Sequence, residues 1–394
     1  MILIDDITLV IGITLMTVAL VAPFINVMMK RIKALDLVED DEDNAADGNG
    51  DDAMTADKPG ISIVLTVNDE GLDLKENLGI LLKQKYSGEY QVVVVMTGND
   101  ELAENVLKGY AGEPKLYTTF IPASSRYMSR KKLAVTVGVK AAKYEWIMLT
   151  DVDCRPESEL WLESIARKCS ASKDVVMGYS AFEEDYKAVR RFDHSYNIYR
   201  QLADAERGRA WGYCGNNLLF RKSMFLKGKG FDGNLKFIRG EYDFIVNKFA
   251  TESNTAVAVM PGMAVTETEL TDKGWRNKNL YYLSTRKHLE RAGRPRMIFN
   301  ATMWMMAASI ILPIAGIAMG AATQRWIALG VSALVLIITL AIRGIVLKKS
   351  VGRLLPDMGA VRLLWFEITL PLRNALRMMH YRATDKFDFI CHKI

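Results

Sequence analysis

The sequence predicts an α/β domain built on a mostly parallel β-sheet and flanked by helices that can span a membrane. Residues 60–296 alternate short apolar runs with helix-like segments, a pattern typical of right-handed βαβ units. Long uncharged blocks lie on both sides of this region. The strand-like run WIMLTDVDC ends in two carboxylates, Asp151 and Asp153. Ligands of such sheets bind at the carboxyl ends of the strands, so these acids lie where a site is expected.

The uncharged blocks cover residues 7–29, 297–323 and 326–342 and predict three membrane helices. The third block ends at Arg343 before the apolar sequence resumes, so we expect this side chain to extend toward the membrane edge. The first block does not have the pattern of a cleaved signal peptide, because acids precede it and its apolar core is too long.

Basic clusters adjoin all three blocks and predict their orientation. They are Lys30, Arg31 and Lys33, then Arg291, Arg294 and Arg296, and finally Lys348, Lys349 and Arg353. The positive-inside rule places all three clusters in the cytoplasm. The N-terminus is then expected outside, with the large middle region in the cytosol.

The charge distribution predicts a tether between the first span and the α/β domain. Residues 36–57 contain ten acids and no Lys or Arg, which is typical of a solvated, disordered segment. Without these ten negative charges, the formal net charge of +5 becomes +15 on the rest of the chain. A basic remainder suits an anionic membrane surface and anionic substrates. No nucleic-acid-binding motif is present, so nucleic acid is not an expected partner.

The predicted organisation has five parts. These are an N-terminal span (1–30), an acidic linker (31–59), the α/β domain (60–296), two spans (297–347) and a cytosolic tail (348–394). Residues 361–382 of the tail mix apolar side chains with arginines, which predicts an interfacial amphipathic helix broken near Pro371. The four cysteines, among them Cys391, show no metal-ligand spacing.

Within the α/β domain, the first part of the chain gives the clearest elements. Strands are expected at 61–66, 91–96, 116–121 and 146–150, and helices at 72–84, 101–109 and 131–143. No Gly-rich loop follows the first strand and no G-x-S-x-G occurs, which argues against a dinucleotide enzyme, a P-loop NTPase or a Ser/His/Asp hydrolase.

The Asp151–Asp153 pair predicts a site for a hard divalent cation. In an extended chain, side chains two residues apart point the same way. Mg²⁺ or Mn²⁺ is commonly bound by one or two carboxylates, with substrate phosphates completing its ligands. The alternative is a solvated Asp-x-Asp turn, because Asp favours turns.

From about residue 58 to 293 the sequence resembles the inverting family 2 glycosyltransferases of the GT-A fold, particularly bacterial membrane-anchored members. Four segments carry the resemblance: ISIVLTVNDE, SRKKLAVTVG, LTDVDC and GEYDFIVN. It implies a nucleotide-sugar donor, with a UDP-sugar favoured, and a lipid-linked or cell-envelope glycan acceptor. It also implies the inner (cytoplasmic) membrane as the location.

The resemblance also implies roles for single residues. Asp69 would lie near the nucleotide and Lys131 near the donor diphosphate. Asp153 would be a metal ligand, with Asp151 a second ligand or a ribose contact. Asp243 would be the catalytic base, with Glu241 as an alternative base; a helix-start acid is the other interpretation of Asp243.

Glycosyl transfer needs these kinds of group whatever the family. Charge on the leaving diphosphate has to be neutralised, and the acceptor hydroxyl needs a carboxylate within reach of its proton. In the segment GYCGNNLLFRKS, Gly215 and Asn216 could face an acceptor sugar or form a simple turn. Trp211, just before it, could stack on a sugar or pack internally.

The chain departs from the family pattern at three places. Met96 and Thr97 follow the second strand, where acids are usual, and Tyr242 precedes Asp243, where the family has Glu. Of the later Gln-x-x-Arg-Trp element only Arg286 is kept, which could clamp diphosphate or contact lipid headgroups. These departures leave two alternatives open: a degenerate scaffold or binding subunit, and a metal-dependent nucleotidyl- or phosphoglycosyl-type transferase.

Overall fold

The computed structural model describes residues 58–98, 100–121, 129–268 and 271–384, and isolated residues between 10 and 35. The chain divides into two compact units. The α/β unit comprises residues 32–292 and 381–394, and the helical unit comprises residues 1–31 and 293–380. Most of the predicted N-terminal span and acidic linker lies outside the described residues, as does Cys391, so these predictions stay predictions.

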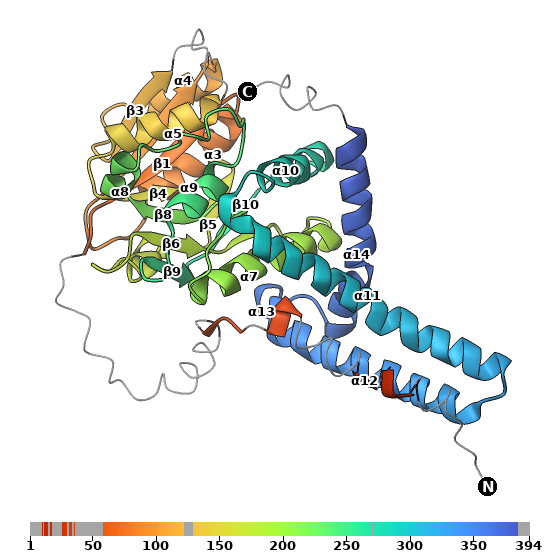
Figure 1. Ribbon diagram of the computed structural model, residues 1–394. Helices are drawn as coiled ribbons and strands as arrows, with labels where there is room; N and C mark the ends of the chain where they lie inside the picture. The colour runs from red at the N-terminus through yellow and green to blue at the C-terminus, as the bar shows by residue number, and fades with distance from the viewer. Residues whose placement is uncertain are drawn as a thin grey trace, which may run out of the picture. The chain divides into compact units, whose positions relative to one another are not determined.

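The α/β unit contains a seven-stranded sheet in the order β3-β2-β1-β4-β8-β6-β9 (Figure 1). Its strands are β1 (Ile61–Val67), β2 (Tyr90–Thr97), β3 (Leu116–Ile121), β4 (Trp146–Leu149), β6 (Val175–Gly178), β8 (Leu218–Arg221) and β9 (Thr255–Ala258). Within this sheet β8 runs antiparallel to its neighbours β4 and β6, and the other pairs are parallel. The prediction of a mostly parallel sheet is confirmed.

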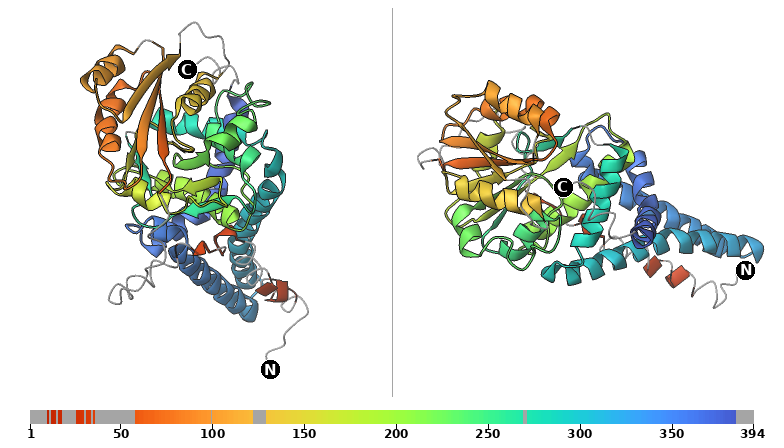
Figure 2. Two further views of the ribbon diagram at one scale, coloured as in Figure 1. Left: turned by 90° about the vertical axis from the view of Figure 1, so that its left-hand side faces the viewer. Right: turned by 90° about the horizontal axis from the view of Figure 1, so that it is seen from above.

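Helices cover both faces of this sheet (Figure 2). On one face, α3 (Gly71–Leu82) and α6 (Trp161–Ala166) form a core with the alternate side chains Ile61, Ile63 and Leu65 of β1. On the other face lies α5 (Arg130–Ala141). A Cβ atom added to its Gly138 would lie only 2.5 Å from a methyl group of Val64, so the glycine allows α5 to approach the sheet closely.

Every strand and helix predicted between residues 61 and 150 is present, with its ends within two residues of the prediction. The remaining one of these predicted helices is α4 (Glu101–Gly109). Its first turn is capped by the Asp100 side chain, which accepts a hydrogen bond from the Ala103 N–H. The β-branched strand runs and the well-separated helices made this part of the chain predictable.

A second, three-stranded sheet lies beside the first and was not predicted. It has the order β5-β10-β7, with β5 (Cys154–Pro156), β7 (Ser180–Phe182) and β10 (Val265–Glu267). The antiparallel pairing of β10 with β5 sets Glu267 opposite Cys154, next to the Asp-x-Asp turn. The rest of the unit comprises α7 (Ala188–Glu206), α8 (Lys222–Lys227), α9 (Glu241–Phe249), α10 (Asp272–Thr285) and η2 (Glu290–Ala292).

The described part of the helical unit contains η1 (Val27–Met29), α11 (Gly293–Ala322), α12 (Trp326–Lys349), α13 (Val351–Leu354) and α14 (Ala360–Ala383). Two helical stretches, Glu290–Ala322 and Trp326–Lys349, are long and apolar enough to cross a membrane by length and composition. Only 28% of the most apolar window of each is buried, so neither resembles the core helix of a soluble protein. The chain therefore has two candidate membrane spans after the α/β unit.

Arg343 does not extend toward the membrane edge, contrary to the prediction. Its side chain is only 4% exposed, and its Nε donates to Glu367 Oε2 of α14 at 2.9 Å. A second guanidinium nitrogen donates to Ser309 Oγ of α11, and Glu367 also accepts a hydrogen bond from Asn26. The sequence prediction was wrong because the partner carboxylate lies 24 residues further along the chain. A buried charge is tolerated when such a partner is present.

The predicted break near Pro371 is also wrong. The helix α14 runs through this proline without interruption from Ala360 to Ala383. Proline removes one backbone hydrogen bond, and the Arg373 guanidinium donates to the carbonyl oxygen of Phe366 at 2.8 Å, one turn before the proline.

Candidate active site

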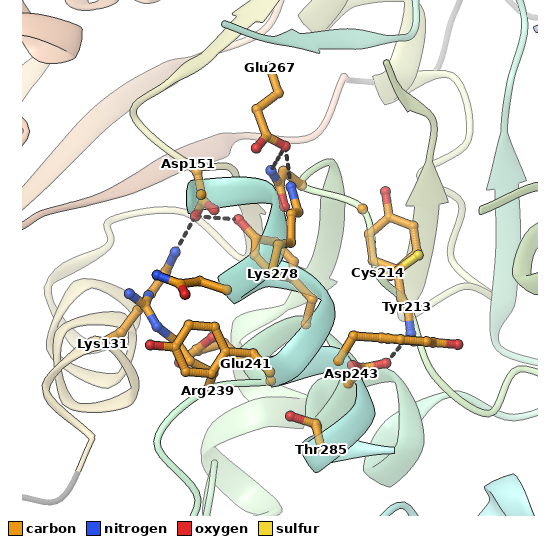
Figure 3. A pocket seen from close by; sticks show the side chains of 18 of the residues that line it. Lys131, Asp151, Tyr213, Cys214, Arg239, Glu241, Asp243, Glu267, Lys278 and Thr285 are labelled. Carbon is orange, nitrogen blue, oxygen red and sulfur yellow. Dashed lines mark hydrogen bonds and ion pairs between the residues drawn. The ribbon is translucent and has the colours of Figure 1, made fainter. Parts of the chain in front are cut away.

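A pocket of about 470 Å³ lies at the carboxyl end of β4 in the α/β unit (Figure 3). It is lined by the turn after β4, the first turns of α5 and α9, and α10. Its ionisable lining residues other than tyrosines and Cys214 are Glu70, Lys131, Asp151, Asp153, Arg239, Glu241, Asp243, Glu267, Lys273 and Lys278. Of the ten predicted site residues, the pocket brings together seven: Lys131, Asp151, Asp153, Gly215, Asn216, Glu241 and Asp243.

Asp151 is held by two partners from distant parts of the chain. One carboxylate oxygen accepts hydrogen bonds from Lys131 Nζ at 2.7 Å and from the Tyr242 hydroxyl at 2.9 Å. Burial alone would raise the pKa of Asp151, but the charge of Lys131 and the hydrogen bonds from Lys131 and Tyr242 together outweigh burial and hold this pKa below its usual value. Asp151 is therefore ionised and fixed in place. Tyr242, which departs from the family pattern, here ties α9 to this carboxylate.

Asp153 has a different environment. Its carboxylate contacts the Cys154 thiol at 3.5 Å, while its backbone carbonyl accepts hydrogen bonds from the N–H and hydroxyl of Thr268. Burial, followed by the nearby charges of Glu267 and Asp151, raises the pKa of Asp153 well above its usual value. Three carboxylates thus lie close together, and the one at Asp153 has no cationic hydrogen-bond partner among those observed.

The carboxylates of Asp151, Asp153 and Glu267 suit a divalent cation that is bound together with a substrate. A cation would relieve the repulsion that raises the pKa of Asp153. Within the described residues, no group of three or more His, Cys, Asp or Glu side chains forms a complete ligand cage. Mg²⁺ and Mn²⁺ do not need one, because phosphate oxygens and water commonly supply the remaining ligands.

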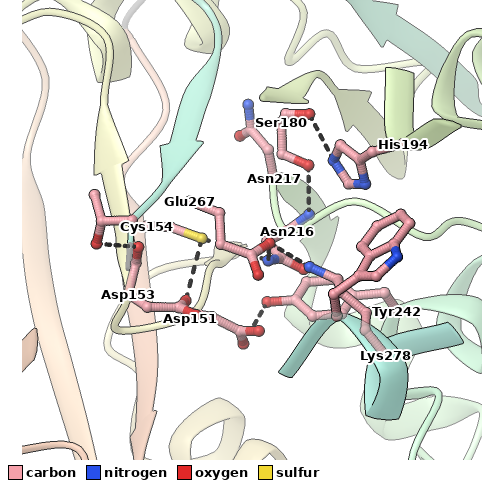
Figure 4. Close-up of polar contacts among 12 residues, drawn as sticks. Asp151, Asp153, Cys154, Ser180, His194, Asn216, Asn217, Tyr242, Glu267 and Lys278 are labelled. Carbon is pink, nitrogen blue, oxygen red and sulfur yellow. Dashed lines mark hydrogen bonds and ion pairs between the residues drawn. The ribbon is translucent and has the colours of Figure 1, made fainter. Parts of the chain in front are cut away.

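The buried Glu267 and the half-buried Lys278 form an ion pair that sequence reasoning missed (Figure 4). Lys278 Nζ is ion-paired with Glu267 Oε2, and the same oxygen accepts a hydrogen bond from Asn216 Nδ2 at 3.0 Å. Asn216 Nδ2 also lies 3.5 Å from Cys154 Sγ. The predicted acceptor-side residue Asn216 is therefore tied to the carboxylate next to Asp153. No sequence signal marked Glu267, because its strand has only three residues.

Asp243 lies in the first turn of α9 and is only 5% exposed. One of its carboxylate oxygens accepts a hydrogen bond from the Tyr213 N–H at 2.8 Å. Burial raises the pKa of Asp243 to about 7, the Tyr213 hydrogen bond and Arg286 oppose the rise, and the charge of Glu241 adds to it. A carboxylate with a pKa near 7 is suited to general base catalysis at neutral pH.

Glu241 lies one residue before Tyr242 and is 4% exposed. Its Oε1 atom is buried without a hydrogen-bond partner in the described part of the chain. The preceding Gly240 has a φ of +95°, and a Cβ there would lie 2.3 Å from the Thr285 methyl group. This glycine allows the sharp entry into α9 that directs both carboxylates, Glu241 and Asp243, toward the pocket.

Three predicted site residues do not line the pocket. Asp69 is exposed in a left-handed conformation with φ of 56°, and its neighbour Glu70 lines the pocket instead. Trp211 is 2% exposed and its indole N–H donates to Asp204, which supports the packing alternative. Arg286 follows α10, with its guanidinium 5.6 Å from the centre of the Tyr282 ring.

The departure at the end of β2 has a local structural role. The Thr97 hydroxyl lies 3.0 Å from the Val67 carbonyl oxygen and 2.8 Å from Asn68 Oδ1. It therefore joins the end of β2 to the end of β1, the strand that leads to Asp69 and Glu70. An acid at this position would bring a negative charge beside these two oxygens.

Residues 62–228 match the family profile described as Glycosyl transferase family 2. The chain carries a family 2 glycosyltransferase domain. The matched segment runs from β1 to α8 and includes Lys131, Asp151 and Asp153. Asp243 and Arg286 lie beyond it, in the part of the glycosyltransferase domain that the profile does not cover.

One solved structure has a similar fold. The glycosyltransferase domain and its helices are similar to the mannosyltransferase PcManGT from Pyrobaculum calidifontis in complex with GDP-Man and Mn²⁺. The TM-score is 0.51 and the identity 16%, over 84% of this chain and 97% of that chain. S. aureus TarS 1–349 in complex with UDP-GlcNAc gives a TM-score of 0.40 and 12% identity, over 80% and 92% of the two chains. A search of curated proteins found no match. The predictions of a GT-A-like fold and of a glycosyltransferase are confirmed.

Proposed function

We propose that the glycosyltransferase domain transfers a sugar, with inversion, from a nucleotide sugar to a lipid-linked or cell-envelope glycan acceptor. The reaction takes place at the cytosolic face of the bacterial inner membrane, with the N-terminus of the chain outside. The donor diphosphate binds beside Lys131, and Asp151 and Asp153 would hold a divalent cation that helps to neutralise its charge. Asp243 is the general base.

The observation that carries this proposal is that one pocket is lined by both kinds of group that the reaction needs. Asp151 and Lys131 lie on one side of the pocket, and the buried carboxylate of Asp243 lies on the other (Figure 3). Asp153, two residues after Asp151, also lines this pocket. The raised pKa of Asp243, about 7, suits proton abstraction, whereas the lowered pKa of Asp151 suits permanent ionisation. Two carboxylates with such different environments support two different roles.

In this mechanism the acceptor hydroxyl gives its proton to Asp243 as its oxygen attacks the anomeric carbon of the donor sugar. The bond between that carbon and the diphosphate oxygen breaks, and its electron pair stays with the diphosphate. Attack from the face opposite the leaving group inverts the anomeric configuration. Lys131 stabilises the charge that develops on the diphosphate. A bound divalent cation would add Lewis-acid stabilisation of the same charge.

The nucleotide-sugar donor is supported by the family profile and by the GDP-Man and Mn²⁺ in the complex of PcManGT. A membrane-linked acceptor is supported by the helical unit. Besides the two candidate spans, α14 has exposed apolar side chains at helical spacing. These are Val361, Trp365, Leu372, Leu376 and Met379. With arginines on the same helix, α14 has the composition of a helix that lies in a membrane interface.

The first test measures donor binding by the full-length protein in detergent. Thermal stability is recorded with UDP-, GDP- and CMP-linked sugars, each with and without Mn²⁺. We expect one nucleotide to stabilise the protein in the presence of the cation. Asp153→Asn should abolish this stabilisation. As a matched control, Asp232→Asn changes an exposed acid outside the pocket and should leave it unchanged.

The second test follows transfer of labelled sugar from that donor to a bacterial lipid extract. Asp243→Asn should keep donor binding and lose transfer, and the product should have the inverted anomeric configuration. Transfer that survives Asp243→Asn would favour a nucleotidyl- or phosphoglycosyl-type reaction. A folded wild-type protein that binds none of the donors would instead favour a binding or scaffold subunit.

A further inference from the structure

The segment before α9 carries an arginine that no sequence motif marked. Arg239 lines the pocket together with Lys131 and Asp151 (Figure 3). Its electrostatic neighbours are Glu241, Tyr281, Asp151 and Glu70, which come from four separate parts of the chain. Arg239 lies beyond the segment that matches the family profile, and it is 47 residues before Arg286.

The backbone that holds Arg239 is anchored to α5. The Ser129 hydroxyl donates to the carbonyl oxygen of Ile238 at 2.6 Å, one residue before Arg239. Lys132, which is fully buried, donates through Nζ to the carbonyl oxygens of Asn234, at 3.0 Å, and of Phe237. Lys132 Nζ also lies 4.6 Å from the centre of the Phe244 ring in α9. A buried lysine that binds two backbone carbonyl groups of one loop indicates a loop whose position is fixed. The next residue in α5 before Lys132 is Lys131 itself.

The Arg239 side chain is supported on one face only. Its guanidinium carbon lies 5.4 Å from the centre of the Tyr281 ring, an arrangement that orients the planar group by a cation–π contact. Within the described part of the chain, Arg239 makes no hydrogen bond and no ion pair. By contrast, the neighbouring cations Lys131 and Lys278 are ion-paired with Asp151 and Glu267.

A guanidinium that is oriented, lines a pocket and has no N–H group bonded to any described residue suits a planar or tetrahedral oxyanion. Arginine binds phosphate through two parallel N–H···O bonds, which a lysine cannot do. The adjacent ammonium of Lys131 adds a second positive charge. Both substrate classes in the proposed function can supply a phosphate: the donor carries a diphosphate, and a lipid-linked acceptor can carry one.

We propose that Arg239 binds a phosphate group of the substrate and, with Lys131, forms the phosphate clamp of this site, in the place that the sequence assigned to Arg286. This inference rests on the proposed function. Arg286 follows α10, stacks on Tyr282 and is not among the residues that line the pocket. Loss of most of the family element around Arg286 is then compatible with activity, because another arginine supplies the guanidinium.

The experiment compares nucleotide affinities of the full-length protein by titration calorimetry at fixed Mn²⁺. The probes are the nucleoside diphosphate that the wild type binds and the matching monophosphate. Arg239→Gln should weaken diphosphate binding about tenfold, equivalent to ~1.4 kcal/mol, and change monophosphate binding less than twofold. Arg239→Lys keeps the charge but loses the paired N–H groups, so its effect should be intermediate. Lys236→Gln removes an exposed charge from the same loop and should change neither affinity.

A second arm distinguishes a donor phosphate from an acceptor phosphate. It measures KM for a short-chain polyprenyl phosphate and for the matching uncharged alcohol. An Arg239→Gln enzyme with unchanged nucleotide affinity but a roughly tenfold higher KM for the phosphate alone would assign Arg239 to the acceptor. If Arg239→Gln changed neither the nucleotide affinities nor the KM for the polyprenyl phosphate, the inference would be overturned and the proposed function would stay intact. A wild type that binds no nucleotide would overturn the proposed function itself.

If Arg239→Gln does not fold, Arg239→Lys carries the same comparison. A structural role for Arg239 would lower affinity for the monophosphate and the diphosphate equally. The ratio of diphosphate affinity to monophosphate affinity therefore decides whether Arg239 binds a phosphate or has a structural role.

Discussion

Replacing Gly212 by alanine is expected to slow sugar transfer without unfolding the domain. A Cβ atom at this position would lie 2.7 Å from Asp243 Oδ1 and 3.1 Å from a methyl group of Leu289. An ordinary contact between carbon and oxygen is about 3.3 Å or longer, so the carboxylate has to move by roughly 0.6 Å. The displaced oxygen is the one that accepts the Tyr213 hydrogen bond.

The size of the effect follows from this displacement. Catalytic groups have to be held to within about 0.5 Å, and a misplacement of about 1 Å can reduce a rate ~100-fold. We therefore expect kcat to fall about 10- to 100-fold. The cost in stability should be small, because the atoms that move are the ends of side chains. Losing the Tyr213 hydrogen bond should also move the pKa of Asp243 further upward.

The assay measures kcat over pH 5.5–9 together with the donor Kd. For Gly212→Ala we expect a lower maximum kcat, a kcat profile shifted to higher pH, and an unchanged donor Kd. Gly109→Ala is the matched control, because no atom lies within 4 Å of its added Cβ. If Gly212→Ala transferred sugar at the wild-type rate with the wild-type pH profile, Asp243 would not be the base.

Four further predictions follow from the same contacts. In the wild type, transfer should rise with pH through about 7 and then level off, because Asp243 accepts a proton only when ionised; a rate that is flat from pH 5.5 to 8 would contradict this. Tyr242→Phe should weaken donor binding about tenfold by removing the hydrogen bond to Asp151, and an unchanged Kd would show that the bond has no role in the donor site. Chelation of divalent cations should abolish donor-induced thermal stabilisation, and restored binding on adding Mn²⁺ alone is the check. In the helical unit, Glu367→Ala should lower stability by about 3 kcal/mol or more, and the double change of Arg343 and Glu367 to Met and Leu should recover much of it in thermal denaturation.

The central sheet could be predicted because its strands carry their own signal. Runs such as QVVVVM are too β-branched and apolar for any position except a buried parallel strand. The Asp151–Asp153 pair could be placed at the open edge for the same reason, because the strand before it was clear. Lys131 and Asp243 could be placed only through the motifs of a family.

The missed residues share a physical cause. Glu267 lies in a three-residue strand, and Lys278 lies in a helix of mixed polar composition, so neither has a periodic pattern around it. Arg239 follows a loop whose position depends on Ser129 and Lys132, more than 100 residues earlier in the chain. Contacts of this kind arise from tertiary packing, and local sequence contains little trace of them.

Tyr242 shows how a departure from a family pattern can be misread from sequence alone. At that stage its replacement of an acid counted in favour of a degenerate protein. In the structure its hydroxyl donates to Asp151 across 91 residues of sequence, and Glu241 still supplies a buried carboxylate next to it. The substitution removes one negative charge from a pocket that already contains many, and it adds a neutral donor to the carboxylate closest to Lys131.

The charge of the pocket explains why such a neutral donor is useful and why a cation is expected. Six acids line the pocket (Glu70, Asp151, Asp153, Glu241, Asp243 and Glu267) against four bases (Lys131, Arg239, Lys273 and Lys278), a formal balance of −2. Raised pKa values at Glu70, Asp153 and Asp243 are the consequence of crowding these acids in a buried space.

A nucleotide diphosphate would add further negative charge to the same space. Phosphate binding is therefore favourable only where cations concentrate, which is the side of Lys131 and Arg239, and only if a divalent ion offsets Asp151 and Asp153. On the opposite side, burial, together with the charge of Glu241, outweighs the Tyr213 hydrogen bond and the charge of Arg286 and keeps the pKa of Asp243 high enough for a base.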